Sequence, residues 1–242
     1  MVDVVIFAGG TGSRMGSKTP KQFLKIDGKP IIIHTLEKYD GCNEIDQIVV
    51  VCKEEYIGFC KQLITEFGLE KVNDVIAGGA TGQESIYRGL KFFHERSETP
   101  EQDIVMMHDG VRPVIDGEQI KRCIDGVRKH GNSVAASKAI ETIIRVDDHD
   151  VMKETVDRTS CRYAKAPQSF WLSDIWEAHQ KALADGKTNF IDSAYLMSAY
   201  GAELHIVECG ADNIKITTPN DFYMFKAMYE AKKSGLGLDA EG

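Results

Sequence analysis

A glycine-rich segment near the start of the chain has the residue types that phosphate binding requires. Residues 9–16 read GGTGSRMG, with four glycines among eight positions, and Arg14 and Lys21 supply two cations. Glycine lets successive backbone N–H groups point into one concavity that suits phosphate oxygens. The two charges favour a polyphosphate over a neutral ligand, although a tight turn without any ligand remains the alternative interpretation.

Two other phosphate-binding glycine motifs fit this segment poorly. A Walker A loop requires Gly-Lys followed by Ser or Thr, and residues 9–21 contain no such tripeptide. A dinucleotide fingerprint requires a third glycine at position 15, where this chain has Met15. Neither of these two motifs therefore describes the segment.

Three further stretches contain side chains that could take part in catalysis or binding. Asp109 follows an apolar run and precedes Arg112, so it is a candidate Mg²⁺ ligand beside phosphates, with a helix cap as the alternative. Gly78–Ser85 is a second glycine turn, which could contact a base edge or simply begin a helix. Lys215 stands between two isoleucines, so it is either an edge-strand charge or a site residue, and Arg158 is equally open.

The pattern of apolar residues predicts the elements that must position these side chains. Strands are expected at 2–8, 48–51, 72–77 and 103–107, and helices at 31–39, 54–67 and 84–95. Such alternation predicts a parallel sheet covered by helices on both faces. Open sheets of this type bind ligands at the carboxyl ends of their strands, where the glycine turns and Asp109 lie.

The second half of the chain is less regular. Two strands at 141–146 and 151–156 predict a hairpin that leaves the sheet as an arm, spanning about 139–160. The other expected elements are helices at 115–130, 173–183 (capped by Ser173), 192–200 and 219–233, and strands at 133–137, 204–207 and 214–216. We expect one domain over residues 1–233 and a frayed tail at 234–242.

Composition excludes several classes of protein. Lys and Arg number 29 against 37 Asp and Glu, and the net charge of −8 disfavours a nucleic-acid or anionic-membrane partner. No run of 18 apolar residues is present, so no membrane span is expected. The six cysteines are scattered without a Cys-x-x-Cys pair, which favours reduced thiols in a cytoplasmic protein.

Several motifs together resemble the polyol-phosphate cytidylyltransferases, which join CTP to a polyol phosphate. They occur in the same order along residues 3–230: AGGTGSRMG, PKQF, Gly78–Ile86, HDGVRP, TVDR, APQSF and ADNIKIT. The family includes the 2-C-methyl-D-erythritol 4-phosphate enzymes of isoprenoid synthesis and the D-ribitol-5-phosphate enzymes of teichoic-acid and capsule pathways. The resemblance implies a Rossmann-like three-layer α/β/α nucleotidyltransferase fold with a mostly parallel central sheet and a protruding β-hairpin arm.

The resemblance also implies roles for individual residues. Catalytic cations would be Arg14, Lys21 and Lys215, which stabilise charge as the α-phosphorus of CTP is attacked. The metal ligand would be Asp109, with Asp212 a weaker candidate, and the cofactor Mg²⁺. The polyol phosphate would be held by Arg112, Thr142 and Arg158. The nucleotide would be bound by Ala8, Gly9, Gly10, Thr11, Gly12, Gly79 and Ser85. In the family the arm swaps across a homodimer to complete the partner's site.

The acceptor is less clearly indicated than the nucleotide. The segments around PKQF and APQSF resemble the ribitol-phosphate branch, whereas TVDR and ADNIKIT fit both branches. Gly82, Ala166 and Ile191 depart from the family pattern, and Ile191 replaces a threonine usual in the methylerythritol enzymes. We expect ribitol 5-phosphate, with methylerythritol phosphate as the alternative. A sugar-1-phosphate transferase using UTP or GTP, and a non-catalytic nucleotide-binding module, are the competing hypotheses.

Overall fold

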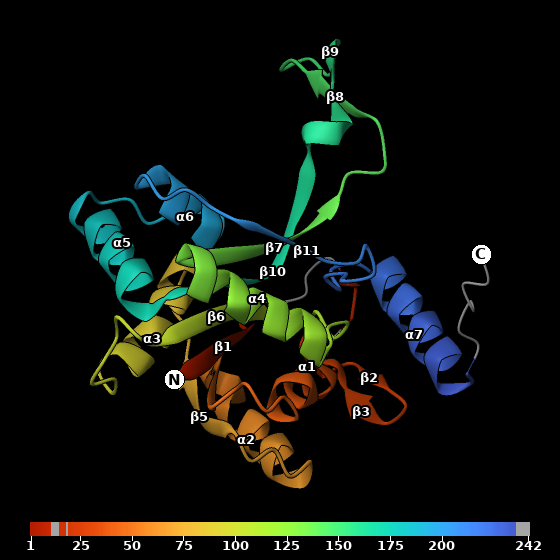
Figure 1. Ribbon diagram of the computed structural model, residues 1–242. Helices are drawn as coiled ribbons and strands as arrows, with labels where there is room; N and C mark the ends of the chain where they lie inside the picture. The colour runs from red at the N-terminus through yellow and green to blue at the C-terminus, as the bar shows by residue number, and fades with distance from the viewer. Residues whose placement is uncertain (11–14, 18, 236–242) are drawn as a thin grey trace.

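A twisted sheet lies at the centre of the structure, which is a computed structural model describing residues 1–10, 15–17 and 19–235. Within this described part the sheet has seven strands in the order β11-β7-β10-β6-β1-β4-β5 (Figure 1). Its strands are β1 (Val2–Ala8), β4 (Gln47–Cys52), β5 (Val72–Ala77), β6 (Ile104–Asp109), β7 (Asn132–Lys138), β10 (Arg162–Trp171) and β11 (Ile206–Glu208). Only β10 runs antiparallel to its neighbours, so the predicted mostly parallel sheet is confirmed.

Helices cover both faces of the sheet, as the continuous apolar runs of the strands predict. Val4 and Ile6 of β1 face one cluster, which is completed by α1 (Ile31–Asp40), α2 (Ile57–Glu66) and α4 (Gly117–His130). Val5 faces the opposite cluster, which is completed by α3 (Gly82–His94), α5 (Leu172–Ala184) and α6 (Ser193–Ala199). Alternate side chains of one buried strand therefore enter two separate cores.

One glycine allows helix α3 to lie directly against the sheet. A Cβ atom on Gly89 would stand 2.3 Å from Cγ1 of Val5 and 3.2 Å from Cγ2 of Val51. No side chain fits at that separation, so Gly89 sets how closely α3 approaches strands β1 and β4. The N-terminal turn of α3 thereby lies next to the carboxyl ends of those strands.

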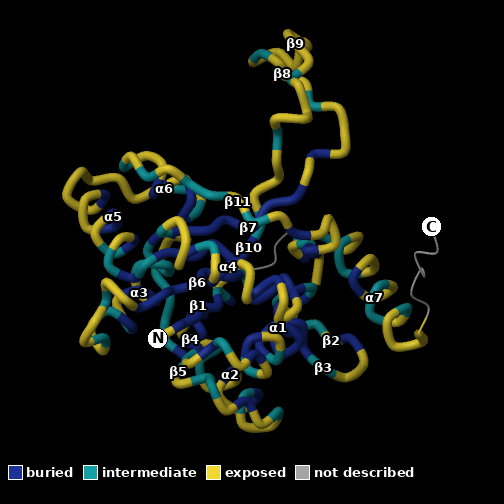
Figure 2. The backbone as a smooth tube through the Cα atoms, in the orientation of Figure 1, coloured by how far each residue is buried: buried dark blue, intermediate teal, exposed yellow. Residues whose placement is uncertain are grey.

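The predicted arm is present and extends away from the sheet. It contains β8 (Ile143–Val146), β9 (Met152–Val156) and the short helix η4 (Arg158–Ser160), between β7 and β10 (Figure 1). Most of its residues are exposed (Figure 2), including the apolar side chains of Ile144, Val151 and Met152. Within one chain the hairpin has few neighbours beyond its own two strands.

The remaining elements surround the start and end of the chain. Helix α7 (Pro219–Lys233) packs Phe225 against Ile26, Ile31 and Ile216. Thr218 caps it by accepting from the N–H of Asp221, whose carboxylate accepts the Thr218 N–H in return. Smaller elements are η2 (Lys21–Phe23), the pair β2 (Lys25–Ile26) and β3 (Lys29–Pro30), and η3 (Glu54–Tyr56).

Two local predictions were wrong. Ser173 does not cap α5, because the helix begins one residue earlier at Leu172, and Trp171 occupies the cap position without a side-chain bond. Residues 214–216 do not form a strand. The N–H of Ile216 donates to the carbonyl of Val111 at 2.9 Å, so a loop contact replaces the expected ladder of hydrogen bonds.

Candidate active site

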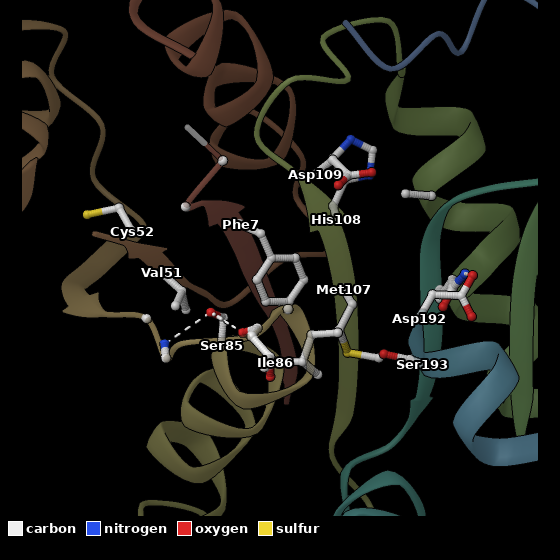
Figure 3. Close-up of a pocket in the computed structure, with 18 of the residues that line it drawn as sticks. Phe7, Val51, Cys52, Ser85, Ile86, Met107, His108, Asp109, Asp192 and Ser193 are labelled. Atoms are coloured by element: carbon white, nitrogen blue, oxygen red, sulfur yellow. Dashed lines mark hydrogen bonds between the residues drawn. The ribbon is translucent and has the colours of Figure 1, made fainter. Parts of the chain in front are cut away.

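A cleft of about 650 Å³ opens at the carboxyl ends of β1, β4 and β6. Its two walls come from different parts of the chain: Ser85 lies on one side of Phe7 and Met107, and Asp192 lies on the other (Figure 3). Of the residues expected to form the site, the cleft is lined by Gly9, Gly10, Gly79, Ser85, Asp109, Arg112 and Lys215. Seven predicted residues from four separate stretches of sequence therefore meet at one place.

Asp109 is the electrostatic centre of the cleft. Its Oδ1 lies 2.6 Å from Nζ of Lys215, and its Oδ2 accepts a bond from Nε of Arg112 at 2.9 Å. Burial alone would raise the pKa of this carboxyl, but the charges of Lys215 and Arg112 outweigh it and hold the pKa below its usual value. The carboxylate is therefore ionised at neutral pH and remains partly accessible, with 24% of its side chain exposed.

Packing of the flanking residues directs Lys215 toward Asp109. Ile216 is fully buried beneath α7, and its N–H is fixed by the carbonyl of Val111. Ile214 and Ile216 both pack into the cluster around Phe225, whereas Lys215 between them is half-exposed and lines the cleft. Lys215 therefore reaches the cleft as a site residue would, although it lies in a loop.

Arg112 is held by a buried network beside this pair. Its Nη1 donates to the carbonyl of Asn213 at 2.9 Å, and Nδ2 of Asn213 donates to the carbonyl of Ala166 at 2.8 Å. The Ala166–Pro167 peptide is cis. The bonds from Arg112 to Asp109 and to the carbonyl of Asn213 fix the orientation of the guanidinium, which prepares it to bind an anion with its remaining donors.

His108, next to Asp109, is a buried neutral imidazole. Its Nε2 lies 3.0 Å from the carbonyl of Arg112 and so carries the proton, while its ring meets that of Tyr39 at 5.1 Å. Burial lowers the pKa of His108 to about 4, although the bond to the Arg112 carbonyl acts in the opposite direction. His108 supports the turn that follows β6 and supplies no charge to the cleft.

The first glycine segment is only partly described. Gly9 and Gly10 line the cleft, and the carbonyl of Ala8 accepts a bond from Nε2 of Gln22 at 2.7 Å. Lys21 is mostly buried, and a Cβ atom on Gly10 would lie 3.5 Å from its Cε, so this side chain runs along the glycine backbone. Thr11, Gly12 and Arg14 lie outside the described residues.

The second glycine segment presents backbone to the cleft. Oγ of Ser85 accepts the N–H of Gly79 at 3.1 Å and donates to the carbonyl of Thr81 at 2.9 Å (Figure 3). Oγ1 of Thr81 accepts the N–H of Glu84 and caps helix α3. The segment is thus both the start of a helix and a wall of the cleft, so the two interpretations from sequence do not exclude each other.

Arg158 and Thr142 lie on the arm, away from the cleft of their own chain. Nη1 of Arg158 donates to the carbonyl of Ile140 at 2.7 Å, and Arg158 lines a separate cavity with Lys138 and Arg162. Thr142 is exposed. One chain alone therefore does not bring these two residues to Asp109.

Asp212 lines a third cavity, between α1, α4 and α7, rather than the cleft. Among the residues the structure describes, no three His, Cys, Asp or Glu side chains converge as a metal cage would require. Mg²⁺ is commonly held by one or two carboxylates together with substrate phosphates, so the ionised, partly exposed Asp109 suffices as a protein ligand. The donor set fits Mg²⁺ through Asp109 and gives Asp212 no direct access.

Several residues of the cleft were not anticipated from the sequence. Lys165 of β10 lines it, and burial together with the charge of Arg112 lowers the pKa of its ammonium. Gln168 is buried and accepts the N–H of Ala194 while donating to Asp192 at 3.1 Å, which positions the wall opposite Ser85. The sequence offered only weak signals for these residues: Lys165 stands between two alanines, and Gln168 belongs to the APQSF motif.

Comparison with known proteins identifies what this cleft resembles. The profile of the 2-C-methyl-D-erythritol 4-phosphate cytidylyltransferase (IspD) family matches residues 2–231. A ribitol-5-phosphate cytidylyltransferase of Streptococcus agalactiae serotype V is 47% identical over 231 residues, covering 95% of each chain. A 2-C-methyl-D-erythritol 4-phosphate cytidylyltransferase of Clostridium botulinum is 33% identical over 221 residues, covering 91% of this chain and 96% of its own.

A solved structure shows the same architecture. The 4-diphosphocytidyl-2C-methyl-D-erythritol synthase of Anaerococcus prevotii superposes with a TM-score of 0.80 at 25% identity, covering 95% of this chain and 98% of its own. The resemblance inferred from sequence motifs and the nucleotidyltransferase-like fold are thereby confirmed. None of the helices formed by described residues is both long and apolar enough to cross a membrane.

Proposed function

The chain belongs to the 2-C-methyl-D-erythritol 4-phosphate cytidylyltransferase family, and on this premise we propose that it transfers CMP from CTP to D-ribitol 5-phosphate. The products would be CDP-ribitol and pyrophosphate. The observation that carries the choice of acceptor is the 47% identity with a ribitol-5-phosphate enzyme, against 33% with a methylerythritol-phosphate enzyme, each over most of the chain.

The chemistry requires no nucleophile from the protein. A phosphate oxygen of the acceptor attacks the α-phosphorus of CTP, forming a P–O bond while the bond to the β-phosphate oxygen breaks and pyrophosphate leaves. Catalysis then consists of positioning and electrostatic stabilisation. Lys21 beside Gly10, and Lys215 beside Asp109, supply positive charge at the two sides of the reacting phosphates. Arg14 is proposed as a third cation from the family motif alone.

Mg²⁺ would bind through the carboxylate of Asp109 and would neutralise charge on the triphosphate. Both oxygens of Asp109 contact cations in this structure, at 2.6 Å for Lys215 and 2.9 Å for Arg112. We propose that ion binding at Asp109 frees the ammonium of Lys215 to turn toward the phosphates. Asp212 remains a weaker proposal because it lines a different cavity.

The nucleoside and the acceptor would take opposite walls of the cleft. Gly79 and Ser85, with their fixed backbone and hydroxyl groups, suit the polar edge of cytosine. Arg112 suits the acceptor phosphate. The six free cysteines are compatible with a reducing compartment such as the cytoplasm, and the net charge of −8 does not favour a nucleic-acid partner.

We also propose that the arm contributes Arg158 and Thr142 to the site of a second copy, making the working unit a homodimer. This arrangement is supported by the exposed apolar side chains of the hairpin and by the position of Arg158 in a cavity separate from the cleft of its own chain. A protein that buries such side chains in a partner avoids exposing them to water.

Pyrophosphate release tests the proposed activity directly. The protein, CTP and Mg²⁺ are incubated with ribitol 5-phosphate or methylerythritol 4-phosphate in parallel, with a chelator control. Release that requires ribitol 5-phosphate and is abolished by chelation is the expected result. Release only with methylerythritol 4-phosphate would assign the alternative acceptor, and replacement of CTP by UTP or GTP would identify another nucleotide specificity. CTP binding without turnover on either acceptor would favour a non-catalytic module.

A mixing experiment tests the arm. Arg158→Ala and Lys215→Ala are each expected to be inactive as purified proteins. Co-expressed together, they should recover about a quarter of wild-type activity, because half of the dimers are mixed and each mixed dimer has one intact site. A mixture as inactive as its components would show that Arg158 does not act in the partner's cleft.

A further inference from the structure

The loop between β5 and α3 forms one wall of the cleft mainly with backbone. Gly78, Gly79, Ala80, Thr81 and Gly82 all line the cleft, and among them only Thr81 has a side chain larger than a methyl group. A ligand on this wall is therefore recognised by N–H and C=O groups, whose directions depend on the conformation of residues 77–82. Side chains that hold the backbone of these residues in place therefore also determine how the ligand is recognised.

Glu84 folds back over the loop from the first turn of α3. Its Oε2 accepts the N–H of Ala80 at 2.8 Å, and its side-chain atoms would lie 2.2–2.4 Å from a Cβ atom on Gly79. Glycine is therefore required at position 79 because the side chain of Glu84 occupies the space next to it. The carboxylate satisfies a backbone donor in the middle of the loop.

Arg88 holds the beginning of the same loop from one turn further along the helix. Its Nη2 donates to Oε1 of Glu84 at 2.7 Å, and its Nη1 donates to the carbonyl of Gly78 at 3.0 Å and to that of Ala77 at 3.4 Å. Glu84 and Arg88 thus form one unit that binds both the entry and the centre of the loop. The side chain of Arg88 is 43% exposed and that of Glu84 40%, and neither is among the described residues that line the cleft.

We propose that Glu84 and Arg88 are positioning residues for nucleotide recognition, which set the backbone of residues 77–82 for the cytosine end of CTP. This inference rests on the proposed function of the cleft. The pair acts through the loop and does not touch the reacting phosphates, which lie on the side of Asp109 and Lys215. Its loss should weaken the binding of CTP and leave the chemical step nearly unchanged.

The ionised state of Glu84 is maintained by its surroundings. The N–H of Ala80, and then the guanidinium of Arg88, hold the pKa of this carboxyl below its usual value. The carboxylate can therefore accept both bonds throughout the neutral range. Glu84→Gln keeps the shape of the side chain but removes the charge, which makes it a closely matched test of the unit.

Steady-state kinetics and calorimetry of Arg88→Ala and Glu84→Gln test the proposal. The KM for CTP should rise about tenfold in each variant, the size expected for losing one charge-assisted hydrogen bond. The kcat at saturating CTP and the KM for the acceptor should stay within about twofold. The Kd for CTP from calorimetry should rise by the same factor as KM.

Lys91→Ala is the matched control. Lys91 lies one turn beyond Arg88 on α3 and pairs with Glu95 at 3.6 Å, another exposed ion pair four residues apart that does not contact the loop. The KM of the Lys91→Ala variant for CTP should equal that of the wild type. All variants should unfold at nearly the wild-type temperature, since exposed pairs contribute little to stability.

The double variant tests whether the two residues act as a unit. If they do, Glu84→Gln combined with Arg88→Ala should be little worse than the worse single variant. An unchanged KM for CTP in Arg88→Ala, additive effects in the double variant, or a parallel loss of kcat and thermal stability would each overturn the proposal. Absence of turnover in the wild type would instead refute the proposed function, and CTP calorimetry would still test the loop.

Discussion

Two aspartates on neighbouring strands show how differently the two ends of this sheet are built. Asp109 ends β6 at the cleft, and Asp3 lies near the start of β1, where its strand partner on β6 is Val105. Both side chains are largely withdrawn from water, yet their pKa values shift in opposite directions. Burial favours the neutral acid in both, so the difference must come from neighbouring charges.

At the cleft, two cations outweigh burial. Lys215 and Arg112 both contact Asp109, and the carboxyl stays ionised. At the opposite end, burial is reinforced by the nearby carboxylate of Asp103, and the pKa of Asp3 rises to about 7 although the amine of Met1 opposes it. Oδ1 of Asp3 has no hydrogen-bond partner within the described structure. The cleft end therefore holds the cations Lys215 and Arg112 in place for an anionic ligand. At the other end, the burial of Asp3 without a partner for its Oδ1 reduces the stability of the fold.

Among the variants that test this contrast between the two ends of the sheet, Lys215→Ala should have the largest effect, a loss of catalytic rate. Lys215→Ala leaves Asp109 with Arg112 alone, so the pKa of Asp109 should rise, and the reacting phosphates lose one stabilising cation. We expect kcat to fall by about 10²–10³, the usual range for deleting one preorganised electrostatic contact. Pyrophosphate release at saturating substrates measures it.

Lys226→Ala provides the control for that experiment. Lys226 is an exposed lysine of α7 whose ammonium lies 3.8 Å from Glu230, outside the cleft. Its substitution should leave kcat and the unfolding temperature unchanged. A Lys215→Ala enzyme with the wild-type rate would refute the catalytic role of the cationic end of the sheet.

Asp3→Asn should remove the acid at the opposite end, with the second largest effect. The folded-state pKa of about 7 lies above the usual 3.8, so the favourable contribution of the neutral acid is complete below the unfolded pKa and is lost as pH rises toward 7. The free energy of unfolding of the wild type should therefore fall by about 2–3 kcal/mol between pH ~5 and ~8 through this residue. The Asp3→Asn variant should not show this decrease.

Urea denaturation at the two pH values measures this difference. Asp148→Asn, at the exposed tip of the arm, is the matched substitution and should leave the pH dependence unchanged. Equal pH slopes for Asp3→Asn and the wild type would show that Asp3 is already ionised in the folded protein, and the contrast with Asp109 would disappear.

The sequence predicted the parallel part of the molecule well because its signals are local. Buried parallel strands are continuous apolar runs, and glycine turns follow them directly. Asp109 could therefore be placed at a strand end, and Lys215 was assigned to the site through the family motif. The strand predicted at 214–216 was wrong because the alternation of Ile214, Lys215 and Ile216 arises from packing beneath α7 and not from a ladder.

The side of the cleft opposite Ser85 depends on contacts between distant segments, and the sequence showed it poorly. Strand β10 returns antiparallel between β7 and β6, which brings Lys165 and Gln168 into the cleft. No local pattern encodes that insertion. The motif around Asp212 suggested a metal ligand, but the turn at 210–213 directs this residue to another cavity. The roles of the arm residues Thr142 and Arg158 stay predictions, because they depend on a second chain.

The smallest effect is expected for substitution of His108, which tests how burial acts on a basic side chain at the cleft end of the sheet. Its folded pKa of about 4 lies below the usual 6.5, so its contribution to stability is present above pH 6.5 and is lost as pH falls toward 4. His108→Gln retains a donor for the Arg112 carbonyl and removes this titration. Between pH ~7 and ~5, the free energy of unfolding should fall by about 1–2 kcal/mol less in the variant than in the wild type. His149→Gln on the exposed arm should behave like the wild type, and so should His108→Gln if the imidazole were already protonated at neutral pH. Burial would then be the weaker influence at the cleft end, and neighbouring charges would decide the protonation of His108 as they do that of Asp109.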